Sequence, residues 1–183
     1  MVNLKSVTDR FEITFNLIEG GSGFVRGVVA EAEQNGAPSY VFSPPRLTLR
    51  VKTKGLLQPG VTIQSPDGLV YLVGYNGPSE NHTGHLWDSF RLFRATGQVK
   101  WSRRETMTDL VTGLPKDSGI VELGTVWSVI EQIDRETLDR KIHSSVEQAR
   151  YITSARIRED DILDGRQVTR ADIQLGLTVG TLT

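Results

Sequence analysis

The feature that most constrains the fold of this 183-residue chain is a hydrophobic period of two, interrupted by turn-forming residues. In the first such run, Phe11, Ile13, Phe15 and Leu17 alternate with polar residues. Alternation of this kind predicts a strand with one face in a core. Similar short runs follow along the chain, at 24–29, 47–51, 61–73 and 90–93. Short strands at this spacing indicate a sandwich or a barrel and not a βαβ fold.

Turn residues divide these runs into hairpins. Asp67-Gly68 separates Val61–Ile63 from Leu69–Val73, an arrangement typical of a tight hairpin. Gly20–Gly23 ends the first run and is interpreted as a flexible turn, because the Lys-Ser or Lys-Thr of a phosphate-binding loop does not follow it. Residues 75–87 are mostly polar and are predicted to form a loop.

The length allows two small domains, and we expect an N-terminal β-domain at 1–96 and a second β-domain at 97–183. A faint repeat supports this division. Gly60 and Gly165 each stand three residues before an aliphatic residue, Ile63 and Val168, and each segment continues into an apolar strand that ends in glycine. Two interpretations stay open: these are features that any two hairpins share, or the chain holds two copies of one barrel half or two related barrels.

One segment departs from the period of two. Leu138, Ile142 and Val146 recur at every fourth position, and Asp134 is suited to cap the first turn, which predicts a helix over 134–151. Three aliphatic residues bury too little area to stabilise this helix alone, so either the helix needs a partner surface or the segment is partly extended. The predicted fold is all-β: one or two small antiparallel barrels or sandwiches with one short helical insertion.

Composition excludes several classes of function. The chain has no cysteine, which excludes disulfides, thiolate metal sites and thiol catalysis. Its 21 basic and 22 acidic residues nearly cancel, so no global field attracts nucleic acid or an anionic membrane. The first residues lack the apolar stretch of a signal peptide, and no run is long enough for a membrane helix. We therefore expect a soluble protein made in a reducing cytoplasm.

The candidates for chemistry are weak. His82 and His85 have a spacing that a metal can use, but a solvated loop is favoured because few other ligands are near in sequence. An acidic run lacks the spacing of a calcium loop and is interpreted as a solvated strand end: Glu159, Asp160, Asp161 and Asp164. No serine or histidine occurs in a recognisable nucleophile pattern. We expect no catalytic residue, no metal and no cofactor.

Two arginines and three tryptophans are candidates for contacts. Arg103 and Arg104 are adjacent on a predicted strand, so they point to opposite faces, and one is available for a partner or for DNA unless both belong to a solvated face. Trp101 and Trp127 are most simply core residues. Trp87 is equally suited to anchor an interface.

The order of signals from Trp101 to Leu182 resembles one protein family. A polar strand is followed by a turn with Asp109, Gly113 and Pro115, then by TVWSVIE at 125–131 and by the pair Arg135-Glu136. This order is similar to that of the head–tail connector (head-closure or stopper) proteins of long-tailed bacteriophages. Ser128 stands where that family usually has Ala. The motifs Ile157-Arg158 and Asp164-Gly165 continue the resemblance, which does not cover residues 1–96.

The resemblance implies a structural protein of the virion neck, made in the bacterial cytoplasm. It would form a homo-oligomeric ring between the portal or adaptor above and the tail proteins below, help to retain packaged DNA, and let DNA pass without sequence specificity. The resemblance implies that 135–151 lies at the channel side or at a subunit boundary. The insertion that reaches toward the channel in that family maps onto Arg135, Glu136, Leu138, Arg140, Lys141, Ile142 and Val146.

Other interpretations stay open. A tail-terminator or baseplate protein uses the same small barrels. A sugar- or nucleic-acid-binding barrel would use Trp87 and Tyr75 as stacking groups. The expected interface residues of a connector are Arg103, Arg104 and Trp87.

Overall fold

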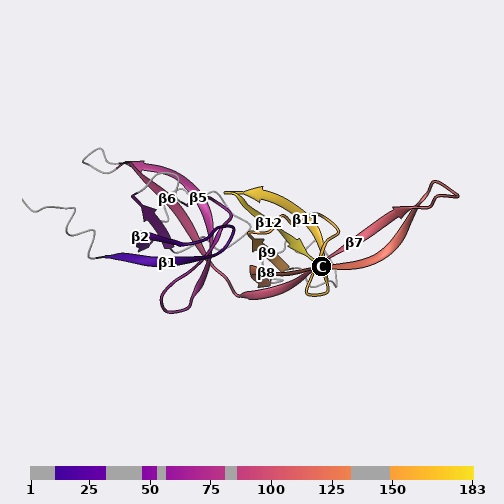
Figure 1. The fold of residues 1–183 in the computed structure, drawn as a ribbon, viewed down its shortest axis with the longest axis horizontal. Coiled ribbons are helices and arrows are strands. Elements are labelled where there is room, and N and C mark those ends of the chain that lie inside the picture. The colour runs from indigo at the N-terminus through magenta and orange to yellow at the C-terminus, as the bar shows by residue number, and fades with distance from the viewer. Residues whose placement is uncertain (1–10, 32–46, 53–56, 81–85, 133–148) are drawn as a thin grey trace, which may run out of the picture. The chain divides into compact units, whose positions relative to one another are not determined.

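A computed structural model describes residues 11–31, 47–52, 57–80, 86–132 and 149–183. In these residues the chain forms twelve strands and no helix, and the strands close into two six-stranded antiparallel barrels (Figure 1). The prediction of an all-β fold built from small antiparallel barrels is confirmed. The chain divides into two compact units, Met1–Ala95 with Ile173–Leu177, and Thr96–Asp172 with Thr178–Thr183.

The first barrel contains β1 to β6. Neighbours follow the order β1-β2-β3-β6-β5-β4, and β4 pairs with β1 to close the barrel. The strands are β1 (Glu12–Glu19), β2 (Phe24–Glu31), β3 (Leu47–Val51), β4 (Thr62–Gln64), β5 (Val70–Glu80) and β6 (Leu86–Arg94).

The alternation in sequence places one face of these strands in a core. Phe15, Val25, Leu49 and Ile63 are among its buried side chains, and the ring of Phe15 meets that of Tyr71 edge-on with 6.3 Å between centroids. Buried polar side chains, among them Thr62 and Asp88, accompany this hydrophobic cluster. The hairpin predicted at Asp67-Gly68 is confirmed as β4–β5, in which Ser65 N donates to Leu69 O across the turn.

The predicted loop at 75–87 is wrong at both ends. Polar residues there continue β5 and begin β6, and the two strands pair from Tyr75↔Phe90 to Glu80↔Leu86. A bulge between Tyr75 and Gly77 lets the ladder continue past the glycine. Residues 75–80 and 86–87 are therefore strand, and residues 81–85 lie outside the described residues.

The second barrel contains β7 to β12, with neighbours in the order β7-β8-β9-β12-β11-β10 and with β10 paired to β7. Its core includes Tyr151, Leu163, Val168 and Leu182, all of which are fully buried. The strands are β7 (Gly97–Thr108), β8 (Pro115–Gln132), β9 (Ala149–Thr153), β10 (Ile162–Leu163), β11 (Arg166–Gln174) and β12 (Leu177–Leu182).

The two barrels have the same topology. Adding six to each strand number of the first barrel reproduces the neighbour order of the second. The chain therefore carries one barrel plan twice, but the repeat expected from Gly60 and Gly165 is out of register. It matches β4–β5 with β11–β12, whereas the strand pairs make β10–β11 the counterpart of β4–β5. In the corrected register Asp67-Gly68 corresponds to Asp164-Gly165.

The predicted helix is wrong at its C-terminal end. Ala149–Thr153 is strand β9, which pairs with β8 on one side and β12 on the other. Tyr151 is fully buried in its own barrel, not at a channel or subunit boundary. The remainder of the predicted helix, with Arg135, Glu136, Leu138, Arg140, Lys141, Ile142 and Val146, lies outside the described residues.

Candidate functional site: a hairpin arm and a pocket in the first barrel

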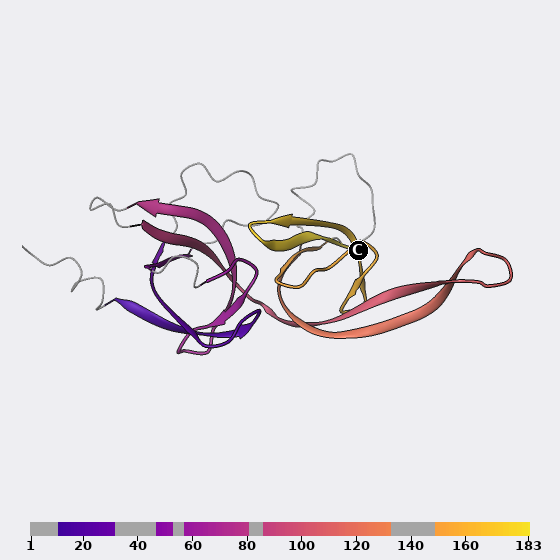
Figure 2. The same cartoon turned by 45° about the horizontal axis from the view of Figure 1, so that its top comes forward.

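The longest hairpin among the described residues projects from the second barrel. β7 and β8 pair continuously from Gly97↔Ser128 to Thr108↔Pro115. β10 pairs with β7 only at Trp101 and Ser102, and β9 pairs with β8 only from Ser128 onward. Residues 103–121, here called the arm, thus form a two-stranded ribbon beyond the barrel wall (Figures 1 and 2).

Two bulges shape the arm. The pairing register shifts between Trp101 and Ser102 and again between Glu105 and Thr106. The residues opposite these shifts are Gly124 and Gly119, which have φ of 129° and 109°. Glycine adopts such angles readily, and a bulge increases strand twist, so the sequence itself bends the arm away from a regular sheet.

The tip of the arm is a defined turn with exposed apolar side chains. Asp109 Oδ1 accepts hydrogen bonds from Val111 N at 2.7 Å and Thr112 N at 3.1 Å. These bonds lower the pKa of the Asp109 carboxyl. Leu110 and Val111 are 101% and 93% exposed, and Leu114 is also exposed. The turn is held in place by its polar groups while its aliphatic groups face solvent.

A buried carboxylate fixes the base of the arm. Asp161, 1% exposed, accepts two hydrogen bonds from Arg103, at 2.7 Å from Nε and 2.9 Å from Nη2. Trp101 Nε1 and Arg158 N each donate to the same carboxylate at 3.0 Å. The Arg103 guanidinium also lies 5.5 Å from the centroid of the Trp101 ring. A bidentate pair of this kind orients both partners, so it ties β7 to the turn before β10.

The electrostatics of this cluster follow from its contacts. Burial alone would raise the pKa of Asp161, but the hydrogen bonds from Arg103, Arg158 and Trp101 together lower it. The same hydrogen bond to Asp161 raises the pKa of Arg103. Burial, followed by the charge of Asp161, raises the pKa of Tyr151. The charged form of the Asp161–Arg103 pair is therefore the stable one.

This cluster corrects one interpretation of the acidic run. Asp161 is not part of a solvated strand end, because it is buried and saturated with donors. Asp164 Oδ1 accepts from Lys100 N at 2.8 Å, and Asp160 Oδ1 accepts from Gln167 Nε2 at 2.8 Å. Three of the four carboxylates thus serve the barrel's own turns. Among the described residues no group of three or more His, Asp or Glu is placed to hold a metal ion.

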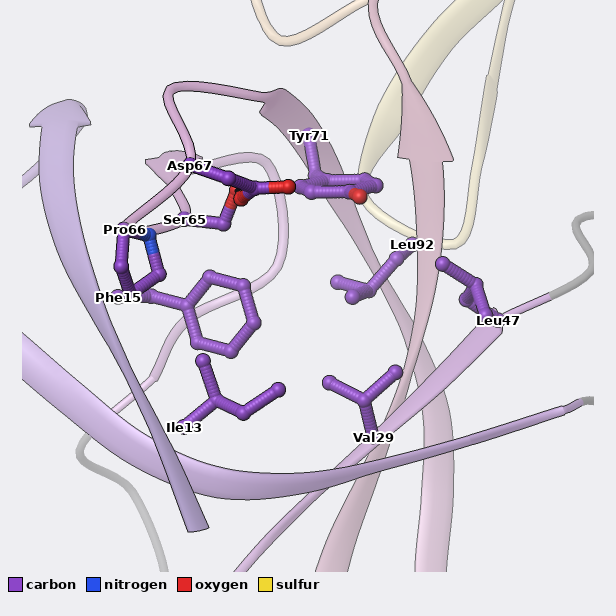
Figure 3. Close-up of a pocket in the computed structure, with 9 residues that line it drawn as sticks. All are labelled: Ile13, Phe15, Val29, Leu47, Ser65, Pro66, Asp67, Tyr71 and Leu92. Atoms are coloured by element: carbon purple, nitrogen blue, oxygen red, sulfur yellow. Dashed lines mark hydrogen bonds between the residues drawn. The ribbon is translucent and has the colours of Figure 1, made fainter. Parts of the chain in front are cut away.

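The first barrel carries a pocket of about 360 Å³ (Figure 3). In the close-up, Ser65, Asp67 and Tyr71 lie along one side, and aliphatic side chains face them. Ser65 Oγ donates to Asp67 Oδ1. The apolar lining consists of Ile13, Phe15, Val29, Leu47, Pro66 and Leu92.

The polar side of the pocket is weakly charged. Burial, and then the nearby charge of Asp67, raise the pKa of the Tyr71 hydroxyl. Tyr71 therefore stays a neutral hydrogen-bonding group at neutral pH, and among the described residues of the lining Asp67 is the only acidic side chain. The arrangement suits an apolar group that enters past an acidic edge.

A second hollow lies where the arm leaves the barrel. It has a volume of about 600 Å³ and is lined by charged, polar and aliphatic residues of β7, β8, β10 and the turn after β10. Lys100 and Glu122 carry opposite charges in this lining. The hollow is wide and mixed in character, so it has less chemical selectivity than the pocket of the first barrel.

The expected interface residues lie in different parts of the chain. Arg103 is bound to Asp161, so its charge is used within the second barrel, whereas Arg104 is exposed on the arm. Trp87 is half-buried on β6, with Lys52 Nζ 5.5 Å from the centroid of its ring. Tyr75 packs against Phe90 of the same barrel, with 5.6 Å between centroids. Arg103 and Arg104 thus belong to the second compact unit, and Trp87 and Tyr75 belong to the first.

The two remaining tryptophans differ. Trp101 packs against the core of the second barrel, as expected. Trp127 is half-buried on β8 and lies outside the buried cluster. His82 and His85 lie outside the described residues. None of the described segments forms a helix with the length and hydropathy needed to cross a membrane.

The sequence patterns did not predict the arm tip as a contact site. The segment around Gly113 reads as a turn, and turns are usually polar. The signal was the presence of three aliphatic residues, Leu110, Val111 and Leu114, in a turn between two polar strands. Aliphatic residues that a turn does not need are a sign of a contact outside the barrel.

Comparisons with protein-family models, with curated proteins and with solved structures find no match to this chain.

Proposed function

We propose that this chain is a structural protein of a bacteriophage virion, a ring component of the neck that joins the DNA-filled head to the tail. The observation that carries the proposal is the arm, which holds aliphatic side chains at the end of a fixed ribbon, away from its own core. Such a shape serves contacts between subunits. The proposed location of this contact, the virion neck, follows from the resemblance of residues 101–182 to head-closure proteins.

The energetics of a ring fit the small size of this contact. A single arm tip offers few aliphatic side chains, so one contact between two copies is weak. A closed ring repeats the contact, and a portal or adaptor ring aligns the copies. We therefore expect the isolated protein to be monomeric or weakly associated, and to form a ring on its upstream partner.

The test is deletion of the gene in a phage that encodes this chain, followed by electron microscopy of the lysate. The proposal expects heads that have packaged DNA, some of them emptied, beside finished tails that are not attached. Wild-type protein supplied from a plasmid should restore tailed particles. A variant in which 105–119 are replaced by Asn-Gly, a turn that joins Arg104 to its partner Ile120, should not restore them.

Other outcomes identify other roles. Tails of irregular length would indicate a tail terminator, and tailed particles without a tip structure would indicate a baseplate protein. Normal particles after deletion would reject a role in the virion. The variant's melting temperature must match the wild type, so that loss of joining reports the arm and not unfolding.

A further inference from the structure

The arm and the pocket of the first barrel have complementary chemistry. The arm tip presents Leu110 and Val111 as a protruding aliphatic group on a turn that Asp109 holds in one conformation. A group that is already ordered loses little conformational entropy when it binds. The tip is therefore prepared to enter an apolar site.

The pocket is large enough for this group. Cavities of about 150 Å³ with aliphatic walls already admit a benzene-sized guest. The pocket of the first barrel, at about 360 Å³, has room for one or two aliphatic side chains. Its aliphatic and aromatic walls gain contacts when such a side chain replaces water.

We infer that the arm tip of one copy inserts into the first-barrel pocket of a second copy of this chain; this inference rests on the proposed ring function. A second copy is the favoured occupant because the chain supplies both halves of the contact. Apolar burial and not charge drives this contact, because the tip and the pocket edge each carry a carboxylate, Asp109 and Asp67.

The geometry of such a contact is head-to-tail. Each copy offers one tip and one pocket, and these are different surfaces, so the contact is heterologous. A heterologous contact leaves a free tip at one end and a free pocket at the other, and it ends only when a ring closes. The ring of the proposed function would be built by this single repeated contact.

The experiment uses the absence of native cysteine. Two purified single variants are mixed under mild oxidation: Val111→Cys at the tip and Asp67→Cys at the edge of the pocket. The matched control replaces the second variant by Thr14→Cys, which is exposed on β1 of the same barrel. The expected result is a disulfide-linked heterodimer that forms about tenfold faster or more than with the control.

A second comparison tests the chemistry of the tip. Leu110→Asp in the Val111→Cys chain should slow trapping about tenfold, because a carboxylate does not enter an apolar pocket. Ile120→Asp, which changes an exposed aliphatic residue of the arm away from the tip, should leave the rate unchanged. Both variants should keep the wild-type melting temperature.

The outcomes separate this inference from the proposed function. Equal rates with Asp67→Cys and Thr14→Cys would overturn the inference. So would exclusive intramolecular closure in a chain that carries both Val111→Cys and Asp67→Cys. If trapping fails while gene deletion still yields unjoined heads and tails, the neck function stands and the arm contacts something else. If trapping succeeds and deletion leaves particles normal, the chain self-assembles outside the neck.

Discussion

The two barrels share one strand plan, but they are stabilised differently. The buried cluster of the first barrel is apolar and contains the Phe15–Tyr71 ring pair. In the second barrel a buried carboxylate, that of Asp161, accepts hydrogen bonds from β7 and from the turn before β10. Both barrels bury a carboxylate, Asp88 in the first and Asp161 in the second, and the carboxylate of Asp161 ties two segments of its barrel together.

They also differ in one hairpin. In the first barrel the hairpin β1–β2 ends in a short turn of Gly20–Gly23, where Leu17 N donates to Gly23 O. Its counterpart β7–β8 continues into the arm. Because the barrel needs only the base of this hairpin, its length is free to change without disturbing the core. The shared strand order thus forms the barrel, and the hairpins that connect its strands are free to make contacts outside it.

The largest effect that separates the barrels is expected at a glycine. A Cβ on Gly180 of β12 would stand 1.8 Å from Arg170 O, a backbone atom that cannot move without breaking the barrel. Gly180→Ala should destabilise the second barrel by about 3 kcal/mol or more and the first barrel less, because of β11, β12 and their turn only Ile173–Leu177 belongs to the first unit. Calorimetry should show one lowered transition. Gly97→Ala on β7, where nothing lies within 4 Å, is the control and should have little effect.

Loss of the buried charge should come next. Asp161→Asn leaves Arg103 without its ionic partner, and we expect a cost of about 2 kcal/mol, less than for a fully buried pair because Arg103 keeps a quarter of its side chain exposed. The control is Asp172→Asn, which removes the exposed Arg170–Asp172 pair and should cost little. Urea denaturation followed by tryptophan fluorescence in a Trp87→Phe background reports the second barrel alone. Equal losses in both variants would contradict the role given to Asp161.

Acid should also destabilise the second barrel more than the first. The pKa of Asp161 is lower in the folded state than the ordinary value of about 3.9 in the unfolded chain. Its stabilising contribution is therefore complete above that ordinary value and is lost as the pH falls through the lower folded value. Below about pH 4 the stability of the second barrel should fall more steeply with pH in the wild type than in the Asp161→Asn variant. An identical pH profile for wild type and variant would show that other carboxyls control acid unfolding.

How much of this was visible in the sequence depends on the distance between partners. The hairpin at Asp67-Gly68 was predictable because its turn and its strands are local. The burial of Asp161 was not, because Arg103 and Trp101 are 58 and 60 positions away. The helix predicted up to Tyr151 failed for the same reason: β9 becomes a strand by pairing with β8 and β12, and those pairs override a weak helical period. The arm tip had a local signal, but its meaning depends on a partner.

The smallest expected effect concerns Ser128, in the motif that carries the resemblance. Its side chain is fully buried, and its Oγ has no hydrogen-bond partner among the described residues. Removing a desolvated hydroxyl stabilises the fold, while the gap that it leaves costs a smaller amount, so Ser128→Ala should be neutral or stabilising by up to about 1 kcal/mol. Thr153→Val is the matched control, because its buried Oγ1 donates to Trp127 O at 2.9 Å, and its loss should cost about 1 kcal/mol or more. The urea midpoint of the second barrel measures both. If Ser128→Ala proved the more damaging of the two, this hydroxyl would have a partner among the residues that the structure does not describe.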